Sequence, residues 1–177
     1  MKPPLLLASA LSLAACQSVA AGPPTAAVAP AQVTAALAPL MRGDAVRSVR
    51  FAMEPPFTEH PVAMRADQLR RDGCRYETDD PGHIATLAAR LREAAVSAAP
   101  AGHESHELRQ VLDIDFADGS TLTLEFGEVF PPDLVLQGSA NGLAVTARRS
   151  LQVDLFRWAR SLLGAPQNCR QFLEDVG

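Results

Sequence analysis

Residues 107–128 read ELRQVLDIDFADGSTLTLEFGE, and this stretch decides the fold. Apolar and polar side chains alternate on both sides of Asp118-Gly119, which is typical of a β-hairpin with an Asp-Gly turn. The alternation predicts one face directed at a core and one face of acids and threonines that meets water. The predicted apolar face comprises Leu108, Leu112, Ile114, Phe116, Leu122, Leu124 and Phe126.

A second hairpin is predicted directly afterwards. Residues 133–149 read DLVLQGSANGLAVTARR, with Asn141-Gly142 at the turn. Upstream, residues 45–53 read AVRSVRFAM and alternate with the period of a further half-buried strand. Two consecutive hairpins and this strand together predict one antiparallel sheet of about four or five strands.

Two amphipathic helices are predicted beside the sheet. In residues 78–96, TDDPGHIATLAARLREAAV, Asp80 is placed to cap the helix and Pro81 suits its first turn. Ser150 is placed to cap a second helix that runs to about Leu163. Their apolar stripes are expected to pack on one face of the sheet, which makes the predicted fold class α+β. The stripes are Ile84, Leu87, Ala88, Leu91 and Ala95 in the first helix, and Leu151, Leu155, Trp158, Ala159 and Leu162 in the second.

The amino-terminal residues have the order of a secretory signal. Lys2 precedes an apolar run from Leu5 to Leu13, and Ala14-Ala15 stand before Cys16. Leu13-Ala14-Ala15-Cys16 resembles the lipobox of bacterial lipoproteins. The resemblance implies that residues 1–15 are a signal peptide removed before Cys16, whose sulfur then carries a diacylglycerol.

Residues 16–41 are low in charge and contain prolines 23, 24, 30 and 39, a composition typical of a semi-extended tether. Residues 31–37 are rich in alanine and are also compatible with a short helix. We expect one α+β domain over residues 42–177. Because Gln17 rather than an aspartate follows Cys16, the expected location is the outer membrane, with the domain facing the periplasm and surface exposure left open.

Two further cysteines, Cys74 and Cys169, remain in the mature chain. An even number of cysteines in an exported protein favours a structural disulfide between them. The absence of a C-x-x-C motif argues against dithiol redox chemistry.

The charge balance excludes one class of partner. The chain carries a net charge of −4, and Lys2 is its only lysine. A chain with this balance lacks the electrostatic footprint of a nucleic-acid-binding protein. Four arginines near the last predicted helix, Arg148, Arg149, Arg157 and Arg160, are interpreted as solvated side chains or, alternatively, as a basic patch.

The segment GHESHEL, residues 102–108, contains a weak candidate for a metal site. Imidazole and carboxylate groups suit zinc or copper, and the candidate ligands are His103, Glu104, His106 and Glu107. The spacing departs from the H-E-x-x-H pattern, so a solvated polar loop is the other interpretation. Asp113, Asp115 and Asp118 do not match a calcium loop, because Ala117 and Leu124 occupy two ligand positions.

No local catalytic signature is present, and neither an enzymatic activity nor a cofactor is predicted. The expected function is that of a membrane-anchored, non-catalytic protein-interaction domain with an envelope protein as its partner and no assigned oligomeric state. The alternatives are a periplasmic metal-binding protein that uses His103 and His106, an inhibitor or immunity protein, and a cell-envelope hydrolase.

Overall fold

The computed structural model describes residues 30–54, 63–100, 107–129 and 135–162. These residues form an α+β structure with a single sheet and four helices, so the predicted fold class is confirmed. No helix of the described part is long and apolar enough to cross a membrane.

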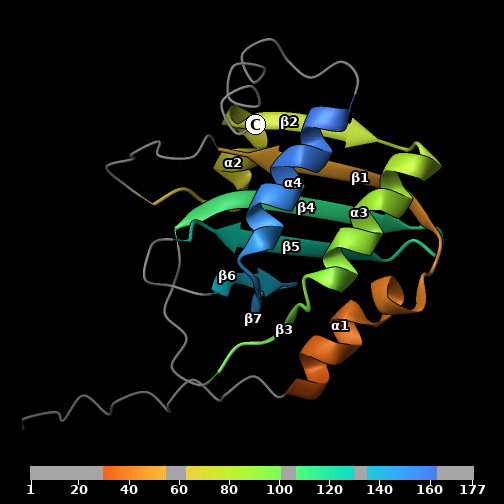
Figure 1. The fold of residues 1–177 in the computed structure, drawn as a ribbon, viewed down its shortest axis with the longest axis horizontal. Coiled ribbons are helices and arrows are strands. Elements are labelled where there is room, and N and C mark those ends of the chain that lie inside the picture. Colours follow the sequence, from red (N-terminus) through yellow and green to blue (C-terminus); the bar gives the residue numbers. More distant parts are fainter. Residues whose placement is uncertain (1–29, 55–62, 101–106, 130–134, 163–177) are drawn as a thin grey trace, which may run out of the picture.

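The sheet has seven strands in the order β2-β1-β4-β5-β6-β7-β3, and every neighbouring pair is antiparallel (Figure 1). The predicted strand and both predicted hairpins are confirmed, but four or five strands is too few. Strands β2 and β3 were not predicted, because they are short and lack a long alternating pattern. The strands are β1 (Val46–Met53), β2 (Cys74–Thr78), β3 (Ser97–Ala98), β4 (Leu108–Phe116), β5 (Thr121–Gly127), β6 (Val135–Ala140) and β7 (Leu143–Arg148).

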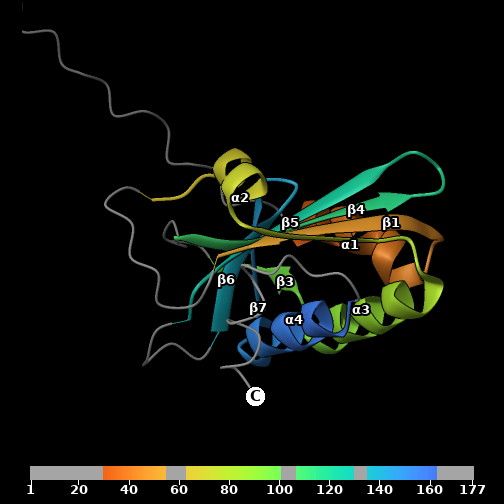
Figure 2. The same ribbon diagram turned by 90° about the horizontal axis from the view of Figure 1, so that it is seen from above.

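The two predicted amphipathic helices pack on the same face of the sheet, as expected, but a helix that was not predicted lies on the opposite face. Three helices lie on one side and α2 lies alone on the other (Figure 2). The two predicted helices correspond to α3 and α4. The helices are α1 (Pro30–Arg42), α2 (Ala66–Asp72), α3 (Pro81–Glu93) and α4 (Ser150–Ser161).

Helix α1 occupies residues that the sequence analysis assigned to the tether. Val33, Leu37 and Leu40 recur at helical spacing and are at most 3% exposed, within the main core. The helical alternative over residues 31–37 is therefore the correct one, and the described fold begins at Pro30 instead of near residue 42. This stripe was difficult to recognise because alanines surround it and Pro39 lies inside the helix.

The main core lies between the sheet and helices α1, α3 and α4. The Phe51 ring is 6.0 Å from the rings of both Tyr76 and Trp158, and the Trp158 indole N–H donates to the backbone oxygen of His83 at 2.9 Å. This bond joins the start of α3 to α4. The predicted α4 stripe is buried throughout.

Two details of the helix ends differ from expectation. Asp80 caps α3 as predicted, since its side chain accepts from the His83 N–H. However, α3 ends at Glu93, and Ala95 is exposed with a φ of 53° where the chain turns toward β3. Ser150 is the first residue of α4, and the cap position belongs to Arg149 without a side-chain bond.

A bulge in β4 changes which face its first residues occupy. The β4–β5 register shifts between Leu108 and Gln110, and Leu108 packs with Val111 in a second small core that includes Ala52 and Leu69. Leu108 was expected on the same face as Leu112, and this prediction is wrong. The bulge places Leu108 under α2, so part of the face expected to meet water is covered.

The β6–β7 turn has the predicted Asn-Gly geometry, with positive φ at both Asn141 and Gly142. At the β5–β6 pairing, Gly138 lies opposite Phe126. A Cβ atom at residue 138 would come within 2.2 Å of the Glu125 backbone oxygen and 2.6 Å of the Phe126 ring. Glycine is therefore required where β6 approaches β5.

We predict that Gly138→Ala destabilises the protein by about 1–3 kcal/mol, because the backbone must move to admit the methyl group. Urea unfolding at neutral pH measures the loss. Gly82→Ala is the matched control, since a Cβ there meets only the Asp80 side chain, at 3.1 Å. Equal stability of the two variants would contradict the prediction.

Candidate functional site

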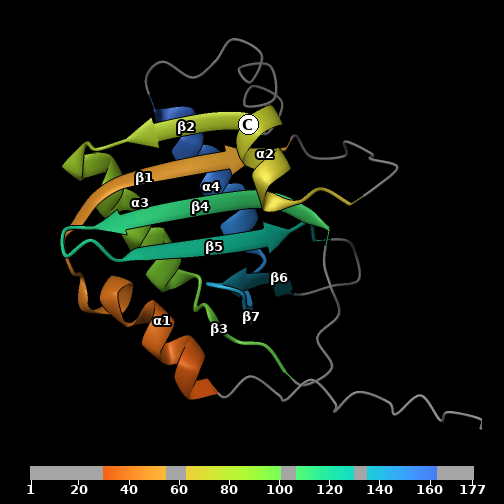
Figure 3. The same ribbon diagram turned by 180° about the vertical axis from the view of Figure 1, so that it is seen from behind.

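Helix α2 lies on the sheet face shown in Figure 3, and charged side chains from α2 and the neighbouring strands converge on this face. Alternate residues of β2, β1, β4 and β5 point to this side, because their neighbours enter the main core. We call this surface the charged face. It comprises Ser48, Arg50, Arg70, Arg75, Glu77, Asp113, Asp115, Thr121 and Thr123.

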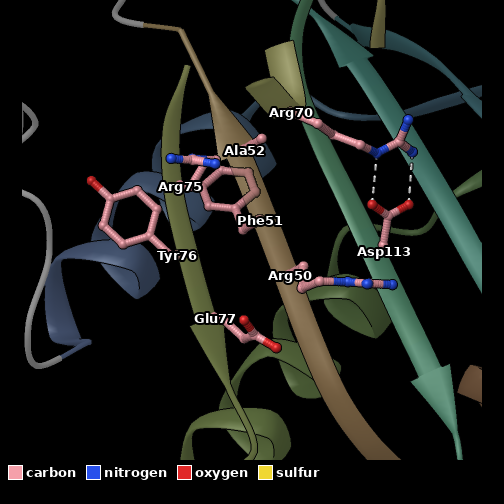
Figure 4. Close-up of a pocket in the computed structure, with 8 residues that line it drawn as sticks. All are labelled: Arg50, Phe51, Ala52, Arg70, Arg75, Tyr76, Glu77 and Asp113. Carbon is pink, nitrogen blue, oxygen red and sulfur yellow. Dashed lines mark hydrogen bonds and ion pairs between the residues drawn. The ribbon is translucent and has the colours of Figure 1, made fainter. Parts of the chain in front are cut away.

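Asp113 lies at the centre of the charged face. Arg70 of α2 donates from Nε and Nη2 to its two carboxylate oxygens, both at 2.8 Å (Figure 4), and the Thr123 hydroxyl also donates to it at 2.8 Å. Burial raises the pKa of Asp113, but the hydrogen bonds from Arg70 and Thr123 outweigh it, so this pKa lies below its ordinary value of 3.8. The bidentate pair attaches α2 to the sheet.

Asp115 makes a second set of cross-strand bonds. Its carboxylate accepts from Ser48 at 3.2 Å, from Arg50 Nη2 at 3.2 Å and from Thr121 at 2.9 Å. These partners come from the strands on both sides of β4. Asp113 and Asp115 are thus explained as acceptors within the sheet.

A cavity of about 630 Å³ opens on the charged face beside β1 and β2 (Figure 4). The small side chain of Ala52 contributes to its lining, between residues with long side chains on the adjacent elements. Arg75 and Glu77 also line it, both are exposed, and neither has a hydrogen bond or ion pair within the described residues. The cavity therefore offers one unpaired cation and one unpaired anion.

We predict that Asp113→Asn lowers the free energy of unfolding at pH 7. The difference in this free energy between the variant and the wild type should shrink below about pH 3.8. A carboxylate with a lowered folded-state pKa contributes stability above its unfolded pKa and loses it as the pH falls through the folded value. Urea unfolding from pH 7 to pH 2.5 tests this. Asp154→Asn, on the opposite face, is the control, and a deficit that does not depend on pH would contradict the prediction.

A second polar cluster is buried where β4 begins and β5 ends. Arg109 is 4% exposed, with Nη2 3.0 Å from Glu107 Oε1 and Nε 3.3 Å from Glu128 Oε2. Gln110 is fully buried, and neither of its amide atoms has a hydrogen bond in the described structure. The bulge places these groups together, and the backbone N–H of Glu54 donates to the Arg109 carbonyl at 2.9 Å.

We predict that Arg109→Met costs about 3–5 kcal/mol of unfolding free energy, because it leaves the buried Glu128 carboxylate, and the partly exposed Glu107 carboxylate beside it, without their cation. Arg90→Met is the matched control, since Arg90 makes an exposed ion pair with Glu93 and its loss should cost under about 1 kcal/mol. Adding Glu128→Leu to Arg109→Met should recover part of the loss. Chemical denaturation measures all three variants, and similar losses for Arg109 and Arg90 would refute the assignment.

The predicted site residues are only partly described. Cys16, His103, Glu104, His106 and Cys169 lie outside the described residues. Glu107 is described, and its carboxylate is engaged by Arg109. Cys74 is the first residue of β2 and is 6% exposed. Its disulfide with Cys169 stays a prediction.

Other candidate groups are also accounted for. Within the described residues, no three His, Cys, Asp or Glu side chains lie close enough to hold a metal ion. The four arginines of the suggested basic patch are exposed: Arg148 and Arg149 follow one another at the end of β7, and Arg157 and Arg160 lie on α4, which is on the opposite side of the sheet from α2 (Figure 2).

Three arginines of these two surfaces were not predicted as site residues: Arg70 and Arg109, which form the ion pairs, and Arg75, which lines the cavity. Arg70 lies on a two-turn helix, Arg75 lies on a strand that was not predicted, and Arg109 lies in a predicted strand but was not singled out. One signal was available for Arg75 and Glu77, since CRYET alternates polar and apolar residues. No local pattern indicates that Arg70 reaches Asp113, 43 residues away.

Comparison with known proteins adds no relative: no family model, no curated protein and no solved structure matches the chain.

Proposed function

We propose that this protein is a lipid-anchored protein of the outer membrane whose folded domain binds another envelope protein through the charged face. The lipobox-like residues Leu13 to Cys16 support the anchor, and the proposal includes acylation of Cys16, a domain that faces the periplasm and the Cys74–Cys169 disulfide. Several acyl chains on one residue hold a protein to a bilayer durably, whereas one chain holds it marginally.

The observation that carries the binding role is the cavity lined by Arg75 and Glu77. Exposed charges elsewhere on the face, such as Arg50, have partners in the sheet, whereas these two have none in the described structure. An open depression, lined about equally by polar and apolar surface and carrying unpaired charges of both signs, suits a protein surface better than an apolar small molecule, whose sites are enclosed and mostly apolar.

The metal-binding alternative is less well supported. Of its four candidate ligands, Glu107 is paired with Arg109, which competes with a metal for the same carboxylate oxygen. The remaining ligands His103, Glu104 and His106 lie outside the described residues, so this alternative rests on their spacing in the sequence.

The proposed function is tested by site-specific photo-crosslinking of the full chain in the native envelope. A photoreactive residue replaces Arg75 or Glu77 and, as the matched control on the opposite face, Arg157 on α4. We expect one protein to be crosslinked from positions 75 and 77 but not from 157. Mass spectrometry of the same sample should find diacylglycerol on Cys16.

With that partner purified, Arg75→Glu should weaken the complex by about three- to tenfold, while Arg157→Glu should leave its Kd unchanged. Crosslinks from position 157 alone, or from none of the three positions, would overturn the proposed interface. An unmodified Cys16 would overturn the anchor.

A further inference from the structure

The cavity on the charged face holds a fixed arrangement of charges that specifies the chemistry of its occupant. Arg75 and Glu77 are two residues apart on β2, and both point to the open side because Tyr76 between them is buried in the main core. Two residues along a strand span about 7 Å. The surface therefore presents a cation and an anion at the repeat distance of an extended chain.

The surrounding side chains do not neutralise this pair. Arg50 lies directly opposite Glu77 in the β1–β2 register, yet its side chain extends away from β2 toward β4 (Figure 4), where its Nη2 donates to Asp115. Arg70 is held by Asp113 through two bonds. Within the described residues, both nearby arginines are thus committed to β4, and Glu77 and Arg75 remain open to a ligand.

The presence of one positive and one negative side chain favours a peptide over an anionic membrane surface as the ligand. A phosphate-rich membrane surface would gain from Arg75 but would be repelled by Glu77, and the whole chain is acidic, with a net charge of −4. A peptide with one acid and one base satisfies both open charges without such repulsion. Arginine also binds a planar carboxylate through two parallel N–H donors, which gives geometric selectivity.

Resting on the proposed function, we infer that the partner presents an extended segment with an acidic and a basic side chain two residues apart, an acid-x-base pair that binds Arg75 and Glu77. The acid contacts the Arg75 guanidinium and the base contacts the Glu77 carboxylate. The segment lies over the depression that Ala52 leaves beside β2, which provides contact area beyond the two charges. Exposed ion pairs contribute little to binding affinity individually, so these two pairs act mainly by disfavouring segments with the wrong charges.

The test uses the full chain in a non-ionic detergent and four labelled hexapeptides that differ only at two positions: Glu-x-Lys, Glu-x-Glu, Lys-x-Lys and Gln-x-Gln. Fluorescence anisotropy measures each Kd. We expect the Glu-x-Lys peptide to bind about three- to tenfold more tightly than Gln-x-Gln. Arg75→Glu should shift the preference to Lys-x-Lys, and Glu77→Arg should shift it to Glu-x-Glu, while Arg157→Glu should leave the ranking unchanged.

Equal binding of all four peptides would overturn the inference. Vesicles containing phosphatidylglycerol form the second arm, and vesicle binding that Arg75→Glu abolishes and Glu77→Arg strengthens would overturn it in favour of a membrane surface. The two proposals fail differently. If a protein is crosslinked from positions 75 and 77 but the four peptides bind equally, only the inference of an acid-x-base pair is overturned. If nothing is crosslinked from this face, the proposed function is overturned as well.

Discussion

The register of three strands, β1, β4 and β5, is the constraint on which the rest of the structure depends. Phe51, Leu112 and Leu124 lie side by side in this register, as do Arg50, Asp113 and Thr123 one residue further along. Because side chains alternate between faces, the same pairing that buries the apolar row also assembles the polar row. A slip of one residue would expose the core and bury the charges, so the core and the charged face are fixed together.

Covering both faces of this sheet requires a local departure from the alternation. The bulge in β4 moves Leu108 under α2, where it packs with Val111 and Leu69, and it brings Arg109 into a buried position beside Glu107 and Glu128. Bulges re-aim side chains at the ends of sheets in this way. The chain then uses two kinds of charged contact: a buried cluster at one end of the sheet, and a bidentate Arg70–Asp113 bond that holds α2 over the open face.

The unpaired charges of the cavity follow from this arrangement. Both arginines nearest to β2 are directed toward β4, where Asp113 and Asp115 also accept hydrogen bonds from threonines of β5. The edge strand β2 therefore retains Arg75 and Glu77 for other contacts. An interface with fixed charges of both signs contributes more to partner selection than to affinity, because solvent screens exposed pairs while like-charge contacts with a wrong partner remain unfavourable.

The sequence by itself determined the α+β class, both hairpins with their Asp-Gly and Asn-Gly turns, the two amphipathic helices and most of the core, because these depend on period and turn chemistry within a few residues. It also supplied the lipobox resemblance, which involves only neighbouring residues. The tertiary structure alone decided the seven-stranded order, the burial of α1, the bulge that redirects Leu108 and Arg109, and the pairing of Arg70 with Asp113. These features join residues far apart in the chain, and whether an arginine is paired, buried or left open depends on which neighbours the folded sheet brings to it.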